Sequence, residues 1–244
     1  MKTYSKMIAV VVMAFASTPV FAQTISSVGS PNVTKGATSV EGRVGFSLDD
    51  DGSSQDERFR SRVHIDYGFT DMYAARLIIE GDKRKGDSFE YEGLTFENRF
   101  DLLDADEIGF DFGMRGSYTL KDGAQKPDNL TIGFYELFPL DKWEIRANQF
   151  LSHEIGEDSE SGLNASVRAQ ATYAIADNHR LGLETFNNFG NLRTQDGFES
   201  QGHSFGPVLK GKLGNGVAYE TGYLVGISDG AADHNMKFFM SKSF

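Results

Sequence analysis

The sequence has 244 residues, with 24 Lys and Arg against 35 Asp and Glu, so its formal net charge is −11, and its mean hydropathy is −0.37. It contains no cysteine, which excludes a disulfide scaffold, thiol catalysis and a zinc-thiolate site. Beyond residue 22 no stretch approaches the roughly 18 consecutive apolar residues of a membrane helix, which excludes helical membrane proteins. The 27 Gly, five Pro and 12% aromatic residues favour an all-β fold with many tight turns.

Residues 1–22 have the pattern of a secretory signal peptide. Lys2 and Lys6 precede an apolar run from Met7 to Ala16, and Val20 and Ala22 fit the small-residue pattern before a cleavage site. The apolar run is about ten residues long, whereas a membrane-spanning helix needs roughly 20. A retained anchor is therefore the weaker alternative, and we expect an exported mature chain that begins at Gln23.

Alternation of apolar and polar residues is the main signal in the rest of the chain. It is clearest in residues 57–68, 107–120, 163–173 and 234–244. Successive side chains of a strand point to opposite faces, so this period of two predicts strands with one apolar and one polar face. Residues 130–138 fit less well, because Leu130, Ile132 and Phe134 are followed on the same face by Glu136, and we expect a β-bulge there.

The connections between these segments alternate strictly between two kinds. Short ones are expected near residues 69–71, 103–106, 139–142, 175–179 and 213–216. Longer polar ones are expected at residues 49–56, 81–88, 121–128, 156–162, 190–200 and 228–233. Together they join about 12 strands of about 9–11 residues, which is the length that a tilted strand needs to cross a bilayer.

These features predict a transmembrane antiparallel β-barrel of about 12 strands, with short periplasmic turns and long extracellular loops. Residues 38–244 would form the barrel, and residues 23–37 a short periplasmic N-terminal segment. The last strand must pair with the first, near residues 39–48, because an open sheet edge in a membrane leaves backbone groups without partners. A soluble periplasmic β-sandwich is the rival fold, since a chain of this length can bury an ordinary core.

The chain also resembles Gram-negative outer-membrane β-barrel proteins. It ends in Phe244, with Met240, Phe238 and Met236 at alternate positions before it, although Lys242 departs from this pattern. Residues 67–71 look like a short periplasmic turn of this class, and residues 219–239 are similar to the final hairpin of small porin-like and copper-resistance-B-like barrels. The resemblance implies that Phe244, Met240 and Phe238 form an assembly signal read by the barrel-assembly machinery, and that the protein lies in the cell outer membrane.

If the apolar faces meet lipid, the opposite faces supply a charged inner surface. The predicted pore-lining residues are Arg58, Arg60, Arg62, His64, Arg76, Glu80, Glu97, Arg99, Arg115, Arg146, Arg168, Glu184 and Glu220. Of these, Arg62, Arg115, Arg168, Glu97 and Glu184 lie near the middle of their strands and would set the constriction. The alternative is that the arginines and carboxylates form a hydrogen-bonded network that plugs the barrel. Tyr67, Tyr73, Tyr118, Phe138, Trp143 and Tyr173 lie at strand ends and suit aromatic girdles at the membrane interfaces.

The favoured function is a porin-like passive channel for small polar solutes. The alternative is a closed structural or adhesive barrel whose acidic loops interact with other molecules, and an outer-membrane hydrolase is the least favoured interpretation. His203 and Ser204 fall on opposite faces, and no arrangement of the other histidines reproduces a known hydrolase pattern. We therefore expect no enzymatic activity, no cofactor and no metal. The expected partners are outer-membrane lipid, lipopolysaccharide, the barrel-assembly machinery and small polar solutes, and no nucleic acid.

Overall fold

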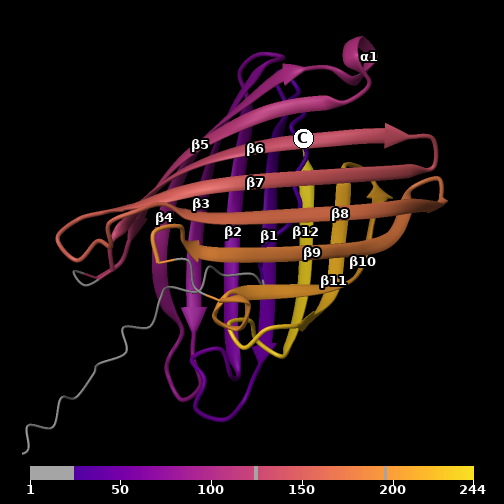
Figure 1. Cartoon of the computed structure of the whole chain (residues 1–244). Helices are drawn as coiled ribbons and strands as arrows, with labels where there is room; N and C mark the ends of the chain where they lie inside the picture. The colour runs from indigo at the N-terminus through magenta and orange to yellow at the C-terminus, as the bar shows by residue number, and fades with distance from the viewer. Residues whose placement is uncertain (1–24, 124–125, 195–196) are drawn as a thin grey trace, which may run out of the picture.

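The computed structural model describes residues 25–123, 126–194 and 197–244, so the predicted signal peptide lies outside the described residues. The described residues form a closed barrel of twelve antiparallel strands, in which each strand pairs with its neighbours in the chain (Figure 1). The strands are β1 (Thr38–Leu48), β2 (Arg58–Gly68), β3 (Tyr73–Lys83), β4 (Glu90–Leu103), β5 (Asp111–Lys121), β6 (Asp128–Leu140), β7 (Trp143–Ile155), β8 (Asn164–Ala176), β9 (His179–Asn191), β10 (Gly202–Gly214), β11 (Val217–Gly226) and β12 (His234–Ser243). The predicted fold class and strand number are confirmed.

The barrel is closed by the pairing of its first and last strands. β1 and β12 are antiparallel from Ser39 opposite Ser243 to Leu48 opposite His234, and the backbone N–H of Phe244 donates to Thr38 O at 2.9 Å. This closure gives partners to the backbone groups that an open edge would expose to hydrocarbon. The expected pairing of the C-terminal strand with residues 39–48 is therefore confirmed.

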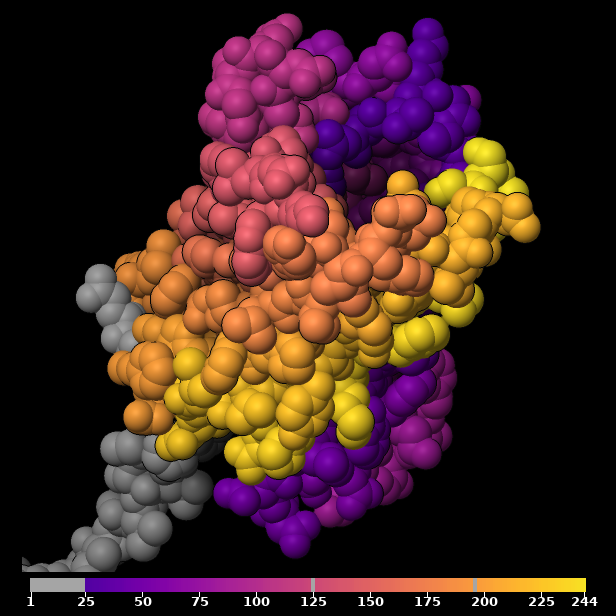
Figure 2. All heavy atoms as spheres, turned by 90° about the vertical axis from the view of Figure 1, so that its right-hand side faces the viewer, coloured from indigo at the N-terminus to yellow at the C-terminus, as the bar shows by residue number. Residues whose placement is uncertain are grey.

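Short and long connections lie at opposite ends of the barrel. In Figure 1 the short turns point to the top and right, whereas the longer loops point to the bottom and left. A two-residue turn, Asp141 and Lys142, joins β6 to β7, while residues 192–201 join β9 to β10 and include the 3₁₀ helix η1 (Phe198–Ser200). Figure 2, viewed from the right-hand side of Figure 1, shows a hollow framed by the indigo and purple early strands and the salmon to yellow later strands.

One short connection holds a helix that the alternation pattern misses. Ile108 falls within the alternating residues 107–120, whose pattern places it on the apolar face of a strand, but it ends the four-residue helix α1 (Ala105–Ile108). Asp104 caps this helix by accepting a hydrogen bond from the Asp106 backbone N–H, and Gly109 ends it in the left-handed conformation, at φ 89°. Both are favourable cap residues, so local capping overrides the period of two here.

The expected bulge in the sixth strand is absent. β6 pairs with β5 and β7 without a shift of register across Glu136. Glu136 keeps its place on the outer face, where its Oε2 accepts a hydrogen bond from Gln149 Nε2 at 2.8 Å. Because a cross-strand amide satisfies the carboxylate there, the strand needs no irregularity, and Tyr135 and Leu137 stay buried on the inner face.

The two faces of the wall differ sharply in polarity. On β2, Val63 and Ile65 are 44% and 45% exposed, whereas His64 between them is 2% exposed. Exposed apolar residues therefore form the outside and polar residues the inside, as membrane barrels require. At the short-turn end, outward rings gather in contact: Trp143 and Tyr173 lie 5.2 Å apart, and Phe69 stacks on Tyr73 at 5.5 Å. No helix within the described part of the chain is long and apolar enough to span a membrane.

Candidate functional site in the barrel lumen

One inner wall of the barrel is built from arginines of β2 opposite carboxylates of β3. Arg58 forms two hydrogen bonds of 2.8 Å with the two carboxylate oxygens of Asp82, and Arg60 Nε lies 3.5 Å from the same group. Arg62 Nε lies 2.7 Å from Glu80 Oε1. These side chains meet because alternate residues of adjacent antiparallel strands share a face. The bidentate pair with Asp82 holds the long Arg58 side chain against the wall.

The same network continues toward the short-turn end. Arg76 Nε donates to Asp66 Oδ1 at 2.6 Å, and Arg99 Nη1 reaches the same oxygen at 3.1 Å. Glu97 Oε1 lies 3.4 Å from both Arg76 Nη1 and Arg115 Nη1. Each carboxylate is thus shared by two guanidinium groups, which offsets the cost of holding charge away from bulk water.

The opposite wall carries a second charged cluster, centred on two lysines. Lys210 Nζ lies 2.8 Å from Glu144 Oε1, which is also 2.8 Å from Arg146 Nε. Lys237 Nζ lies 2.7 Å from Glu184 Oε1 and 2.9 Å from Glu220 Oε1. Both clusters therefore contain cations and carboxylates in contact.

Arg168 lies on this wall without a carboxylate partner among the described residues. Its guanidinium carbon lies 4.4 Å from the centre of the Phe150 ring and 6.0 Å from that of Phe186. Aromatic faces attract a cation through their quadrupole but do not neutralise its charge. Its Nη1 also donates to Ser27 O at 3.4 Å, so Arg168 is a cationic position in the lumen whose charge no carboxylate among the described residues neutralises.

The N-terminal segment lies between the two walls. Sequence analysis places residues 23–37 in the periplasm, but residues 25–33, the described part that precedes the turn into β1, contact inward-facing side chains of β1, β4, β5, β7, β8 and β12. The contacts run from Arg43 Nη1 to Ile25 O at 3.4 Å, midway along β1, to Val33 N with Asp101 Oδ2 at 3.1 Å, near the short-turn end of β4. The segment thus occupies the half of the lumen nearest the short turns.

Apolar packing also holds this segment. Val28 is 1% exposed and forms a small core with Phe186 of β9 and Leu224 of β11, both directed into the barrel. Gly29 passes so close to the wall that a Cβ at this position would lie 2.9 Å from both Arg115 Nη2 and Tyr135 Cε1. Full burial of a valine side chain stabilises by roughly 1.5–3 kcal/mol. The segment is therefore an integral part of the interior.

Comparison with known proteins bears on the fold. No family model matches the chain, and no curated protein matches it. Among solved structures, the chain is similar to the KdgM porin, with TM-score 0.61, 10% identity, and coverage of 84% of this chain and 99% of that chain. The NanC porin gives TM-score 0.59 and 10% identity over 83% and 98%. The outer membrane protein Omp33 of Acinetobacter baumannii gives 0.50 and 11% over 88% and 100%.

The chain has the fold of an outer-membrane porin. Near-complete coverage of the two porins, together with the closed topology, decides this. Exposed apolar residues on the outer face of the barrel fit an outer-membrane location. A second KdgM structure, with TM-score 0.59 and 8% identity, is described as a complex with disordered oligogalacturonate. None of these proteins is described as an enzyme.

The predicted pore-lining residues of this porin-fold barrel all lie on the inner side of the wall. His64 is buried beside Glu41, at 3.3 Å between Nδ1 and Oε1, and the others take part in the contacts described above. Arg115 and Glu97 meet, but Glu184 pairs with Lys237 instead of with an arginine of the expected constriction. That these residues line an open passage stays a prediction.

Sequence analysis does not single out Asn148, whose amide clamps the N-terminal segment. Its Oδ1 accepts from Gly29 N at 2.7 Å, and its Nδ2 donates to Gly29 O at 3.1 Å. The alternation pattern contains a signal for it, since Asn148 lies two residues after Arg146 and so shares the inner face. The pattern contains no signal for the partner, because the partner is backbone.

At the long-loop end, the β1–β2 and β3–β4 loops are tied by Lys85. Its Nζ lies 2.6 Å from Asp56, 3.0 Å from Asp51 and 3.1 Å from Glu57. The hydrogen bond from Lys85 lowers the pKa of Asp56 below its ordinary value, and the same bond raises the pKa of Lys85. The tie thus joins two surface loops by charge.

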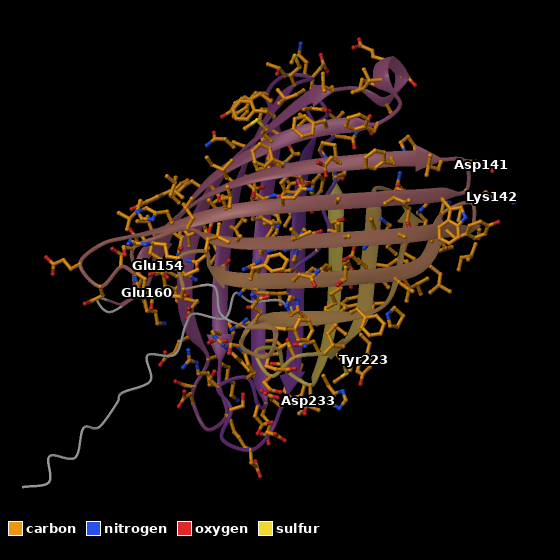
Figure 3. The ribbon with its side chains drawn as sticks, in the orientation of Figure 1. Asp141, Lys142, Glu154, Glu160, Tyr223 and Asp233 are labelled. Atoms are coloured by element: carbon orange, nitrogen blue, oxygen red, sulfur yellow. The ribbon has the colours of Figure 1, made fainter. Side chains whose placement is uncertain are left out.

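Two histidines near the loops make local contacts rather than a catalytic array. His234 stacks on Tyr223, with 2.7 Å between Nδ1 and the hydroxyl, and His153 Nδ1 lies 2.8 Å from Gly162 O. In Figure 3, Glu154 and Glu160 lie together at the left, and Glu154 Oε2 accepts from the Glu160 backbone N–H at 2.9 Å. Among the described residues, no three His, Asp or Glu side chains are grouped to hold a metal ion.

Proposed function

We propose that this barrel is a porin-like passive channel for small polar solutes. The observation that supports the proposal is the charged inner surface of a closed barrel of porin fold, on which arginines of β2–β5 pair with carboxylates of adjacent strands. A barrel of 12 strands is wider than the side-chain-filled barrels of eight, so its lumen can hold an aqueous path. Rings of charged side chains are one way in which such a path selects solutes.

Within this class we favour anionic solutes. Arg168 has no carboxylate partner among the described residues, and the charges that act on it most come from three other lumen arginines, Arg43, Arg62 and Arg115. Guanidinium groups bind carboxylates in a planar geometry. The similar KdgM porin is described in complex with oligogalacturonate, a carboxylate-bearing oligomer, which fits this preference.

Planar-bilayer recording tests the proposal. We expect stepwise, salt-dependent conductance from the purified barrel and a reversal potential in a KCl gradient that indicates preference for chloride. Arg168→Gln should reduce that preference, while Ser159→Ala, in the β7–β8 loop, serves as the control. Conduction with no change of ion preference in Arg168→Gln would remove the role assigned to Arg168 and leave the channel in place.

A closed structural or adhesive barrel is the second candidate. It is favoured by the N-terminal segment and the ion pairs that occupy the interior, which leave the acidic loops as the surface available to other molecules. A folded, inserted barrel that stays electrically silent under all conditions would support this candidate against the channel.

A further inference from the structure

The N-terminal segment is held in the lumen by an unbroken series of hydrogen bonds to its backbone. Six successive carbonyl oxygens, those of residues 25–30, each accept a bond from an inward-facing side chain. The donors are Arg43 to Ile25 at 3.4 Å, Lys237 to Ser26 at 3.2 Å, Arg168 to Ser27 at 3.4 Å, Arg146 to Val28 at 3.4 Å, Asn148 to Gly29 at 3.1 Å and Arg115 to Ser30 at 2.9 Å. Arg99 adds a bond of 3.3 Å to Asn32 O.

This arrangement has the properties of a peptide-binding site. The donors come from six different strands around the barrel, and they bind groups that every residue possesses, so they recognise an extended backbone. Specificity comes from fit, because Val28 fills the apolar core with Phe186 and Leu224, and Gly29 passes where a side chain would meet Tyr135.

The covalent connection between residues 25–33 and the wall lies at the short-turn end, where the chain continues into β1. After Val33 the chain turns through residues 34–37, where Gly36 N donates to Gly68 O at 2.8 Å and Ala37 N donates to Thr34 O at 3.2 Å. Lys35 and Gly36 are exposed, and β1 follows directly. A cut in this turn would therefore separate the segment from the barrel without breaking a strand.

We propose that residues 25–33 are an internal plug, bound in cis in a peptide-binding site of the lumen, and that the passage conducts fully only when this plug leaves the site. The proposal rests on the proposed channel function and assigns its regulation. The seven donors, which include Arg115 and Arg168, then form one site, which binds either the backbone of residues 25–33 or a passing solute.

The test uses a site-specific cut in the folded protein. A protease recognition sequence is inserted between Lys35 and Gly36, and the barrel is refolded, reconstituted in a planar bilayer and recorded before and after cleavage. We expect low conductance before the cut and a stable increase after the cut and release of the plug. A synthetic peptide of residues 25–33 should then return the conductance to its level before cleavage.

Two controls make the test specific. The same recognition sequence inserted between Asp141 and Lys142, in another turn at the same end of the barrel, should be cut without any change in conductance (Figure 3). A peptide that carries Gly29→Trp should not restore closure, because the indole would collide with Tyr135 and Arg115. Heat-modifiable migration on gels confirms that every sample remains a folded barrel.

The outcomes separate the plug from the channel. Equal, measurable conductance before and after release of the peptide would overturn the plug and leave the channel function in place. Silence after verified release would overturn both, since the ion pairs alone would then close the barrel. Closure by the Gly29→Trp peptide as efficient as by the native one would show that the lumen binds peptides without the fit described above, and would overturn the assigned site.

Discussion

Lys237 and Glu184 form an ion pair inside the barrel, with 2.7 Å between Nζ and Oε1 and exposed fractions of 1% and 0% for the two side chains. Lys237 also lies 2.9 Å from Glu220 Oε1 and donates to Ser26 O at 3.2 Å. One ammonium group therefore joins three strands, β9, β11 and β12, to the N-terminal segment.

Removal of this cation should destabilise the barrel strongly. Lys237→Met leaves Glu184 and Glu220 without their shared partner, and breaking a buried pair typically costs about 3–5 kcal/mol. The midpoint of urea unfolding, followed by loss of heat-modifiable migration, should fall accordingly. The double variant Lys237→Met, Glu184→Gln should recover part of the loss, since it removes one of the stranded charges. A double variant no more stable than the single one would contradict this account.

The topology of the barrel in the cell can be read with epitope tags. A tag inserted at Ser53, in the β1–β2 loop, or at Gly123, in the β5–β6 loop, should bind antibody on intact cells, because the long loops face outward. A tag between Asp141 and Lys142 should bind antibody only after the outer membrane is made permeable. The reverse pattern would mean that the barrel has the opposite orientation.

Phe244 should matter for insertion and not for the properties of the inserted barrel. Phe244 is 76% exposed and directly follows β12, whereas the ion pairs of the lumen are made by inward-facing side chains. Its deletion should lower the amount of membrane-inserted protein in cells, and Phe244→Trp should largely restore it, because indole also favours the interface. Arg115→Ala should instead alter conductance or ion preference with a modest effect on yield. Full insertion of the deletion variant would contradict a role for Phe244 as an assembly signal.

The tie between the loops at Lys85 should depend on pH at both extremes. The pKa of Asp56 is lowered in the folded state, so its contribution is complete above the unfolded value of 3.8 and is lost as the pH falls through the folded value. The pKa of Lys85 is raised, so its contribution is complete below 10.5 and is lost as the pH rises through the folded value. The two loops should stay together between about pH 4 and about pH 10.

Spin labels on cysteines placed at Ser53 and Ser88 measure this tie, since the natural chain has no cysteine. The distance distribution should be narrow inside that pH range and broaden on either side of it. In Lys85→Met the distribution should be broad at every pH. A narrow distribution in Lys85→Met would show that other contacts hold the loops.

The sequence predicts those parts of the fold that depend on a local period. The inner position of Arg58 and the outer position of Val63 follow from their odd or even place along β2 alone, because successive side chains of a strand point to opposite faces. The strand number follows from the count of short and long connections, which alternate along the chain. The prediction fails at Ile108, where the Asp104 and Gly109 caps favour one helical turn. It also fails at Glu136, where no bulge is needed because Gln149 donates a hydrogen bond to the outward-facing carboxylate.

The site is less predictable than the wall around it. Parity places Arg115 and Arg168 inside the barrel, but it cannot say that both donate to residues 25–33. Gly29 and Asn148 are 119 positions apart, and the groups that bind in this segment are mainly carbonyl oxygens, which give no residue-specific signal. Binding of a backbone segment by side chains more than 100 positions away leaves no pattern in a single sequence.

The seam between β1 and β12 has a kinetic consequence. It joins Ser39 to Ser243, nearly the first and last residues of the barrel, so its sequence separation is the longest of any strand pairing among the described residues. Contacts of such separation form slowly, because the entropy of closing the intervening loop is lost before they stabilise anything. The ring closes only when β12 reaches β1, so the sheet can curl around residues 25–33 before the seam forms. The cationic side chains of six strands would then leave water only as they bind the carbonyl groups of residues 25–33. The N-terminal segment would thus serve as a folding template around which the ring closes.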